Sequence, residues 1–414
     1  MDLTLVLGLV ALAIAPLVLV RFVNYPRFGV QMLVLSGVLL PVEMLQGQTT
    51  FSACYLLAFM TCGAWLLRQV LVRRQVAFQA NSTVVAILVF SGAAVLSFVT
   101  GLFPWFPIDG APIRAQLGGL SLFLLSGGIA LVVAHELVNL HQLSKLTWLF
   151  IGIGSLTLVV MLLPGTEIHI GPLKVLTHGS VGCLFFVWLV AMSTSQALWN
   201  SRLPVESRLL LLAVAGLTLF RGLVITFDWS SGWLPPLITV GTLLLFRFPR
   251  LTLSSGLLIG TPVLMLAGRA WEKLMVTESW SWLTRIEAQR LVLEMTQRSP
   301  FLGLGPGNYH FYTVLYPILS YRARFNSHNN YTDFVAQGGL IGLVAFSWVA
   351  IELLILSVAL FRRTPNGFAR AYAIGCFAGL MGSLAGGWLA DWIVPFVYNI
   401  GVAGFRSSLL FWVF

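Results

Sequence analysis

Long uncharged apolar runs alternate with short polar segments along almost the whole chain. A run of about 20 residues can cross the ~30 Å hydrocarbon core of a bilayer as a helix. Because hydrocarbon offers no partner to backbone N–H and C=O groups, such runs must be helical. The apolar runs lie at residues 2–20, 28–46, 50–67, 83–103, 117–138, 146–163, 175–197, 208–227, 232–246, 251–268, 331–361, 366–390 and 396–414. The pattern predicts an all-α, polytopic transmembrane helical bundle of about 12 spans, ending in a partial helix.

Composition and charge agree with a membrane protein. Hydrophobic residues make up 58% of the chain and charged residues only 9%, against about 25% charged residues in a soluble domain. The net charge of +10 does not indicate nucleic-acid binding, because the basic residues cluster between apolar runs, where they set topology and meet anionic lipid head groups. The short basic segments are 21–27, 68–74, 202–208, 247–250 and 362–363. The positive-inside rule places them in the cytoplasm and the intervening segments 104–116, 164–174 and 228–233 outside.

One segment departs from this charge bias. Residues 269–330 lie between two spans, on the outer side by the alternation, yet they carry seven basic residues. We therefore divide the chain into N-terminal transmembrane helices at 1–268, an extracytoplasmic loop region with short helices at 269–330, and C-terminal transmembrane helices at 331–414. Ion pairs with neighbouring glutamates on a surface helix at 283–298 are the ordinary explanation for most of these arginines.

Two motifs flank the loop region, and the first is rich in glycine. In the segment Ser299–Asn308, Pro300 is followed by Gly303, Gly305 and Gly307. Proline and alternate glycines end the preceding helix and allow backbone conformations that are closed to other residues. The segment is predicted to form a tight turn.

The second motif is His328-Asn329, followed after nine residues by Gly339 and Gly342. Asn329 is predicted to be the N-cap of the helix that begins near residue 331. Gly339 and Gly342 fall one turn apart on one face, so we expect them to let another helix approach closely. Glu43 and Asp391 lie near outer span ends, where the sequence assigns them no role.

The two motifs together resemble the O-antigen ligase and O-antigen polymerase superfamily of bacterial polytopic membrane glycosyltransferases. That family also has an arginine before the turn, and Arg285 stands 15 positions before Pro300. A further family arginine, usually in Ser-Arg-Gly, lies near the outer end of an earlier span. The match is Arg221, with Phe220 in place of the serine, and Gln289 stands where the family often has tryptophan. The resemblance covers residues 205–360.

The resemblance implies a GT-C-like, membrane-embedded glycosyltransferase in the bacterial inner (plasma) membrane. Its donor is a glycan on undecaprenyl diphosphate, and it moves the glycan to the hydroxyl of a lipid- or glycan-linked acceptor at the outer leaflet. Arginine suits the charge that develops on the leaving diphosphate, since it is always charged and binds phosphate oxygens bidentately. The resemblance makes Arg221 and Arg285 catalytic at the diphosphate and His328 catalytic at the acceptor hydroxyl. The substrate-binding residues are then Asn329, Arg290, Arg322 and Arg324.

Neither a metal nor an organic cofactor is expected. The sequence has no Asp-x-Asp signature, and its four cysteines lie inside apolar runs without metal-ligand spacing. The arginines can do the work that a divalent cation does elsewhere, so we predict a metal-independent reaction. The expected partners are the glycan donor, the acceptor and membrane lipids, and not nucleic acid.

Other interpretations stay open. Arg221 could snorkel to the outer head groups, His328 could be an ordinary hydrogen-bonded histidine, and Tyr309, Tyr312 and Tyr331 are expected in the aromatic belt of the interface. An O-antigen or exopolysaccharide repeat-unit polymerase is nearly as well supported as a ligase, since the two differ only in the acceptor. A lipid-linked oligosaccharide transporter or flippase is a more distant alternative, because the halves of the chain show no repeat and the polar residues gather in one outer loop.

Overall fold

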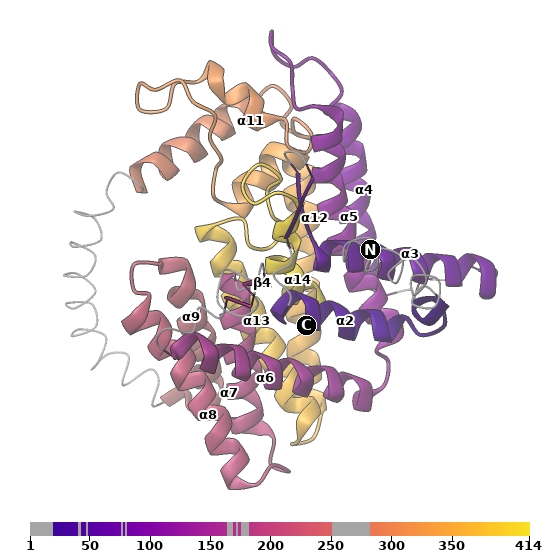
Figure 1. Ribbon diagram of the computed structural model, residues 1–414, viewed down its shortest axis with the longest axis vertical. Coiled ribbons are helices and arrows are strands. Elements are labelled where there is room, and N and C mark those ends of the chain that lie inside the picture. Colours follow the sequence, from indigo (N-terminus) through magenta and orange to yellow (C-terminus); the bar gives the residue numbers. More distant parts are fainter. Residues whose placement is uncertain are drawn as a thin grey trace.

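Helices dominate the computed structural model (Figure 1), which describes residues 20–39, 43–46, 49–75, 78, 81–163, 169–170, 173–174, 182–250 and 282–414. The expected spans at residues 2–20 and 251–268 lie outside the described residues, apart from Val20. For the rest of the chain the predicted all-α class is confirmed, with two short hairpins added.

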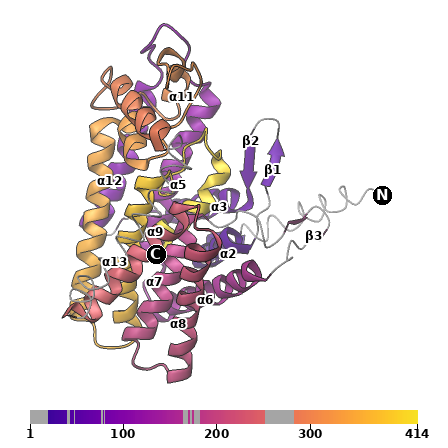
Figure 2. The ribbon, with the colours of Figure 1, turned by 90° about the vertical axis from the view of Figure 1, so that its left-hand side faces the viewer.

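The helices of the described residues are named here in chain order. The helices are α2 (Pro26–Leu39), α3 (Ala53–Leu67) continued by η1 (Arg68–Val72), α4 (Ser82–Thr100), α5 (Ile113–Glu136), α6 (Leu140–Leu162), α7 (Cys183–Trp199), α8 (Val205–Phe220) continued by η2 (Arg221–Ile225), α9 (Ser230–Arg247), α11 (Tyr309–Tyr312), η3 (Thr313–Leu315), α12 (Asn330–Arg363), α13 (Phe368–Leu389), η4 (Val402–Gly404) and α14 (Phe405–Val413). Residues 282–296 form a further helix before α11. The antiparallel hairpins are β1 (Glu43–Gln46) with β2 (Thr49–Ser52), which stands beside α3 in Figure 2, and β3 (His169–Ile170) with β4 (Leu173–Lys174).

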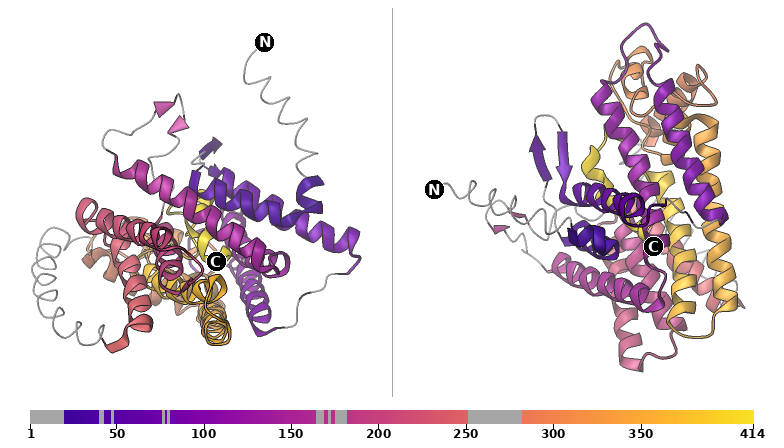
Figure 3. Two further views of the ribbon diagram at one scale, coloured as in Figure 1. Left: turned by 90° about the horizontal axis from the view of Figure 1, so that it is seen from below. Right: turned by 90° about the vertical axis from the view of Figure 1, so that its right-hand side faces the viewer.

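Seven helices in the described part of the chain are long and apolar enough to cross a membrane. They are Ala53–Val72, Ser82–Thr100, Ile113–Glu136, Leu140–Leu162, Val205–Ile225, Asn330–Arg363 and Phe368–Leu389. Helices α4, α5, α12 and α13 run along the bundle, whereas α2, α3 and α6 cross it (Figures 1 and 3). The single span expected at 28–46 is instead the 14-residue α2 and strand β1. Helix α2 ends at Leu39, shortly before Pro41, and proline disfavours helical geometry in the residue that precedes it.

Large apolar side chains are exposed along the outward faces of the long helices. Helix α4 exposes Val85, Leu88, Val89, Val95, Leu96 and Val99, and α12 exposes Leu340, Ile341, Val344, Trp348, Ile351, Ile355, Leu356 and Leu360. A soluble monomer rarely exposes contiguous apolar surface on this scale. In a bilayer the same side chains contact lipid tails, so the exterior fits a membrane protein.

The C-terminal helix α14 is short and packs inside the bundle. Trp412 stacks on Phe90 of α4 with ring centroids 5.8 Å apart, and its indole N–H donates to the Ile393 carbonyl at 2.9 Å. Phe414 packs on Trp188 of α7 at 5.6 Å. The partial helix expected at the end of the chain is confirmed, and it joins α4, α7 and the segment after α13 in one core.

Two of the short basic segments lie together at one end of the bundle. Beyond its break at Gly339, helix α12 continues for 24 residues, or roughly 36 Å, to the basic pair at 362–363. Arg202, which begins another basic segment, lies against Gly367 just beyond that pair. The opposite end carries residues 101–112 and 282–327 (Figure 1), which share a second buried cluster. The basic pair at 362–363 and Arg202 therefore lie at the end of the bundle opposite the predicted catalytic loop.

Helix α12 is interrupted near its start. Gly339 has a φ of +66°, outside the helical range, so neighbouring backbone groups lose their partners within the helix. The turn at residues 300–307 lies against this break and supplies the missing partners, which confirms the predicted turn. The bonds run from Leu304 N to Ala336 O at 2.8 Å, from Gly305 N to Gln337 O at 3.2 Å, from Leu340 N to Pro300 O at 2.8 Å and from Ile341 N to Phe301 O at 3.1 Å.

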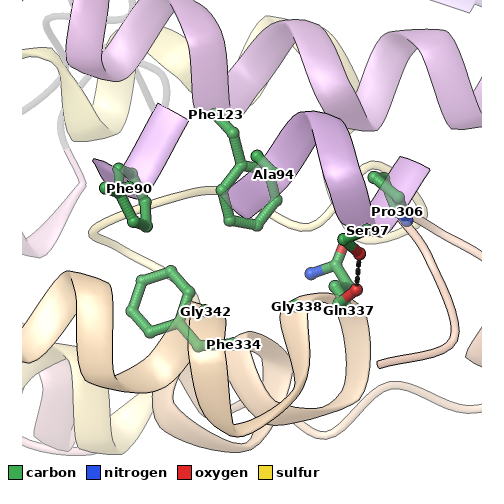
Figure 4. Close-up of a pocket in the computed structure, with 9 residues that line it drawn as sticks. All are labelled: Phe90, Ala94, Ser97, Phe123, Pro306, Phe334, Gln337, Gly338 and Gly342. Carbon is green, nitrogen blue, oxygen red and sulfur yellow. Dashed lines mark hydrogen bonds between the residues drawn. The ribbon is translucent and has the colours of Figure 1, made fainter. Parts of the chain in front are cut away.

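Helix α4 closes the other side of the break. The Ser97 hydroxyl donates to the Gln337 carbonyl, and the side-chain oxygen of Gln337 accepts from Gly307 N–H at 3.1 Å. Figure 4 shows Ser97 and Gln337 beside a hollow of about 10 Å³ that three phenylalanine rings also line. We call the arrangement of residues 300–307 against residues 336–341 the interlock. Packing on both sides fixes the direction in which the start of α12 points.

Two glycines allow the interlock to form. A Cβ at Gly339 would lie 2.2 Å from the carbonyl of Phe301, and one at Gly303, whose φ is +71°, would lie 2.6 Å from the carbonyl of Gln337. The expectation that Gly339 admits a neighbouring helix is wrong, because its positive φ breaks α12 and it admits the backbone of the turn. Gly342 lines the hollow that α12 shares with Ala94 and Ser97 of α4.

Gly339→Ala should destabilise the folded protein, because alanine is strained at a φ of +66° and its methyl group would overlap the turn. We expect a loss of about 3 kcal/mol, seen as a lower midpoint in thermal unfolding of the purified protein in detergent. Gly338→Ala is the matched control, since a Cβ at that position meets no atom within 4 Å. Equal midpoints for the two variants would contradict the interlock.

Candidate functional site

The interlock fixes the start of α12, where His328 and Asn329 lie. The side-chain oxygen of Asn329 accepts from the backbone N–H of Tyr331 at 2.9 Å and of Thr332 at 3.2 Å, so the predicted N-cap is confirmed. His328, directly before the cap, has a φ of +49°, which few residues other than glycine adopt. Such strain persists only where the surroundings enforce it.

A buried hydrogen-bond network enforces this conformation. The carboxylate of Asp333, in the first turn of α12, accepts from the Tyr309 hydroxyl at 2.6 Å and from the Ser327 hydroxyl at 2.7 Å. The Ser327 oxygen in turn accepts from Asn329 N–H at 3.1 Å. His328 is therefore held between two residues that are each anchored to α12.

The segment that follows α13 packs against the start of α12. We call residues 391–404 the 391–404 loop. The side-chain N–H of Asn330 donates to the Val394 carbonyl at 2.7 Å, and its side-chain oxygen accepts from the backbone N–H of Ile393 at 2.7 Å. Within the loop, the buried carboxylate of Asp391 accepts from the backbone N–H of Phe396 at 2.7 Å and from the side-chain amide of Asn399 at 2.6 Å. These bonds hold Asp391 at a fixed place beside His328.

Arg285, on the helix at residues 282–296, extends toward the end of α13, beside His328 and Asp391. Its Nη1 lies 3.5 Å from the Leu389 carbonyl at the end of α13. The carbonyl of Trp388 accepts from Asn329 Nδ2 at 3.2 Å. A cation is favourable at a helix C-terminus, which is an ordinary structural role for Arg285, but a bond of this length is weak.

Three ionisable side chains interact here, and we call His328, Asp391 and Arg285 the His328 cluster. Burial lowers the pKa of His328 below its ordinary value, while the Asp391 carboxylate acts to raise this pKa and the Arg285 guanidinium acts to lower it. Burial raises the pKa of Asp391, and its hydrogen bonds and the charge of His328 act to lower it. The lowered pKa favours the neutral imidazole, and an ionised Asp391 would stabilise the imidazolium formed when His328 takes up a proton.

Arg221 lies outside this cluster but is connected to it through aromatic rings. It begins η2, the π-helical turn that ends α8, and its guanidinium lies 4.9 Å from the centre of the Phe186 ring. Phe186 packs on Trp229 at 6.1 Å, and Trp229 packs on Trp392 at 6.0 Å, next to Asp391 in the sequence. π-Helical turns at the ends of helices are frequent at functional sites.

The other arginines predicted to bind substrate are all exposed. Arg290 pairs with Glu287 at 2.8 Å and with Glu294 at 3.2 Å, as the ordinary explanation of ion pairs on a surface helix expects. Arg322 is open to solvent, and Arg324 lies over an aromatic ring at 4.1 Å. In the described part of the chain, the charges that act on His328 are those of Asp391 and Arg285.

Sequence reasoning missed several polar residues that build this site. Asn330 and Asp333 follow His328-Asn329 directly, and polar side chains at the start of an apolar span are a signal that could have singled them out. Asp391, a carboxylate between two apolar runs, offered the same signal, but its partner lies 63 positions earlier in the chain. Proximity between such distant positions is not encoded in any local pattern.

The tyrosines expected in an interfacial belt are core residues in two of three cases. Tyr309 is 0% exposed and Tyr312 is 1% exposed, and both lie in the second buried cluster that closes this end of the bundle. The half-buried Tyr331 donates to the Leu384 carbonyl at 2.7 Å. The belt interpretation failed for Tyr309 and Tyr312 because both rings are buried inside the protein, where the Tyr309 hydroxyl donates to Asp333.

Comparisons with known protein families and characterised proteins find no match for this chain. Among the described residues, no three His, Cys, Asp or Glu side chains gather as metal ligands would. The function is therefore argued from the site itself.

The pKa of His328 should move in opposite directions in two variants. Asp391→Asn removes the charge that favours the imidazolium, so the pKa falls, and Arg285→Gln removes the charge that disfavours it, so the pKa rises. The pH dependence of diethyl pyrocarbonate labelling, followed residue by residue with mass spectrometry, measures both shifts. His310, whose charged neighbour is Arg324, is the internal reference. Shifts of the same sign at His328 would contradict the assigned cluster.

Proposed function

We propose that this chain is a membrane-embedded glycosyltransferase that moves a glycan from undecaprenyl diphosphate to an acceptor hydroxyl, as an O-antigen ligase does. The supporting observation is that Arg285 and the residues on either side of His328 and Asp391 contact one another where α13 ends, through bonds to the Leu389 and Trp388 carbonyls and between Asn330 and Ile393. A neutral imidazole near a carboxylate can activate a hydroxyl, and a guanidinium can stabilise a leaving diphosphate. The three side chains come from separate segments, and the interlock and the 391–404 loop hold two of them in fixed places.

Arg285 and Arg221 would bind the leaving diphosphate. At 3.5 Å the bond from Arg285 to the Leu389 carbonyl is weak, so the guanidinium gains by turning to a charge-assisted bond with phosphate. Within the described part of the chain, Arg221 forms no ion pair. A cation near the end of a candidate span is costly without a counter-ion, and an anionic ligand offsets that cost.

His328 would take the proton of the acceptor hydroxyl as its oxygen attacks the anomeric carbon of the donor. The bond from that carbon to the diphosphate oxygen breaks as the new glycosidic bond forms, and the diphosphate leaves with the bonding electrons. Asp391 would stabilise the imidazolium that results. Asn329 would keep the backbone of His328 in place through its cap and through its bond to the end of α13. Arg322 and Arg324 stay predicted contributors to substrate binding.

The place of two short basic segments supports an outward-facing site, although the loop region at the His328 end is itself rich in arginine. The basic pair at 362–363 and Arg202 lie at the end of the bundle opposite His328, and the positive-inside rule assigns a basic end to the cytoplasm. The His328 cluster would then face the periplasm or the exterior of a bacterial inner (plasma) membrane. We infer about 12 spans in a GT-C-like arrangement. Of the seven candidate helices in the described part of the chain, α4, α5, α12 and α13 run along the bundle, whereas α3 and α6 cross it.

A repeat-unit polymerase of the same superfamily would use the same donor and the same base. The two activities differ in the acceptor, which is a sugar of the lipid A core for a ligase and another lipid-linked repeat for a polymerase. Only 20 residues separate Gly307 from His328, and this compact segment favours a glycolipid acceptor over a protein. A transporter gains less support, because the site's polar groups gather at the end of the bundle and not at mid-span.

His328→Ala should leave the protein inserted in the membrane and lower glycan transfer at least about 100-fold, because general-base catalysis contributes roughly 100- to 10,000-fold. The assay uses proteoliposomes, an undecaprenyl-diphosphate-linked glycan, and either lipid A core or a second lipid-linked repeat as acceptor. The choice of acceptor also separates ligase from polymerase. His141→Ala, at an exposed position of α6, is the control. Full transfer by His328→Ala would remove the imidazole from the mechanism.

Arg285→Ala and Arg221→Ala should weaken donor use much more than stability, because the charge that each side chain meets belongs to the ligand. We expect kcat/KM for the donor to fall about 100-fold, with thermal midpoints close to that of the parent. Arg290→Ala removes the same charge from an exposed, ion-paired arginine and should keep nearly full transfer. If both test variants keep full transfer, the assignment of the diphosphate is wrong.

A further inference from the structure

The 391–404 loop also borders a second basic site. A groove of about 1080 Å³ runs between α3, α5 and this loop. Three arginines line it: Arg114 at the start of α5, Arg324 in the segment before His328, and Arg406 at the start of α14. No aspartate or glutamate is among the groove-lining side chains of the described residues. The groove is therefore positively charged.

Two of these arginines lie near one tyrosine. Arg324 lies over the Phe311 ring at 4.1 Å, and Phe311 packs on the Tyr398 ring at 5.2 Å. Burial raises the pKa of Tyr398 to about 12, and the charges of Arg324 and Arg114 both act to lower it. Tyr398 also stacks on His310 at 4.7 Å, which fixes its ring. The groove thus has a rigid aromatic platform with two guanidinium groups beside it.

Protein carboxylates do not compensate these two charges in the described part of the chain. The ion pairs there join Glu136 to Arg68 and Arg73, and Arg290 to two glutamates. Arg114 and Arg324 are exposed and take part in none of them. Two like charges at one platform repel each other, and an anion between them would relieve this repulsion.

The groove is apolar beyond its basic rim. Phe59 of α3 and Leu117 and Leu124 of α5 line it. Arg114 stands in the first turn of Ile113–Glu136, which is long and apolar enough to cross a membrane. The groove therefore passes from a basic rim to an apolar wall at the end of a candidate span. A ligand that matches both parts has an anionic head and a hydrocarbon chain.

We propose that this groove binds an anionic phospholipid of the surrounding membrane, with its phosphate held by Arg114 and Arg324 and its acyl chain lying along α5. Guanidinium groups bind phosphate oxygens through short, charge-assisted hydrogen bonds, which zwitterionic lipids satisfy less well because their own ammonium group competes. The proposal does not depend on glycan transfer, although it uses Arg324, which is also predicted to bind substrate. Asn399, which lines the groove, donates to Asp391 at 2.6 Å, so the bound lipid would share a wall with the His328 cluster.

Native mass spectrometry of the detergent-purified protein tests this proposal by resolving individual lipid adducts. The probes are phosphatidic acid and phosphatidylcholine with identical acyl chains, and the competitor is inorganic phosphate. The test variant is Arg114→Gln with Arg324→Gln. The matched control, Arg290→Gln with Arg322→Gln, removes the same charge from exposed arginines outside the groove.

We expect the parent and the control to bind one phosphatidic acid in preference to phosphatidylcholine, and the test variant to bind it at least about tenfold more weakly. Inorganic phosphate should not displace the lipid, because it lacks the chain that contacts α5. Equal binding of the two lipids, or equal losses in the two double variants, would overturn the proposal. Displacement by inorganic phosphate would also overturn it and would make the groove a site for a soluble anion.

Discussion

A helix that breaks inside a protein leaves backbone donors and acceptors open, and in this chain the turn at residues 300–307 satisfies them. The bonds between the turn and residues 336–341 replace those that α12 loses at Gly339. Because the replacement is backbone to backbone, it tolerates no side chain at Gly339 or Gly303, and it sets the position of the turn closely. The start of α12, with His328, Asn329 and Asp333, takes its direction from this contact.

At the same end of the bundle, contacts between distant segments bring His328, Asp391 and Arg285 together. Asp333 and its partners Tyr309 and Ser327 hold His328 in a strained conformation, and Asn330 draws the 391–404 loop against it. A structural account of Arg285 as a helix cap competes with the catalytic account. The 3.5 Å distance to the Leu389 carbonyl is long for a hydrogen bond, so this contact stabilises little and leaves the guanidinium able to bind a ligand, as the proposed function requires.

Local patterns predicted much of this fold and only part of the site. Apolar runs identified the helices because backbone groups in hydrocarbon must pair within a segment, and Asn329 identified the cap because its side chain acts on the next turn. The break in α12 was not predictable in this way, since it depends on a partner more than 30 residues away. The crossing of α3 and α6, and the approach of Asp391 to His328, depend likewise on packing between distant elements.

The central claim is that Arg285 and Arg221 bind the diphosphate of the donor beside His328, and an electron cryo-microscopy structure with undecaprenyl diphosphate in nanodiscs tests it most directly. The account predicts density for the two phosphates in contact with the Arg285 guanidinium, with the His328 ring facing the same space and the polyprenyl chain leading into the bilayer. Phosphate density at the end of the bundle that carries Arg362 and Arg363, or density that touches neither Arg285 nor Arg221, would contradict it.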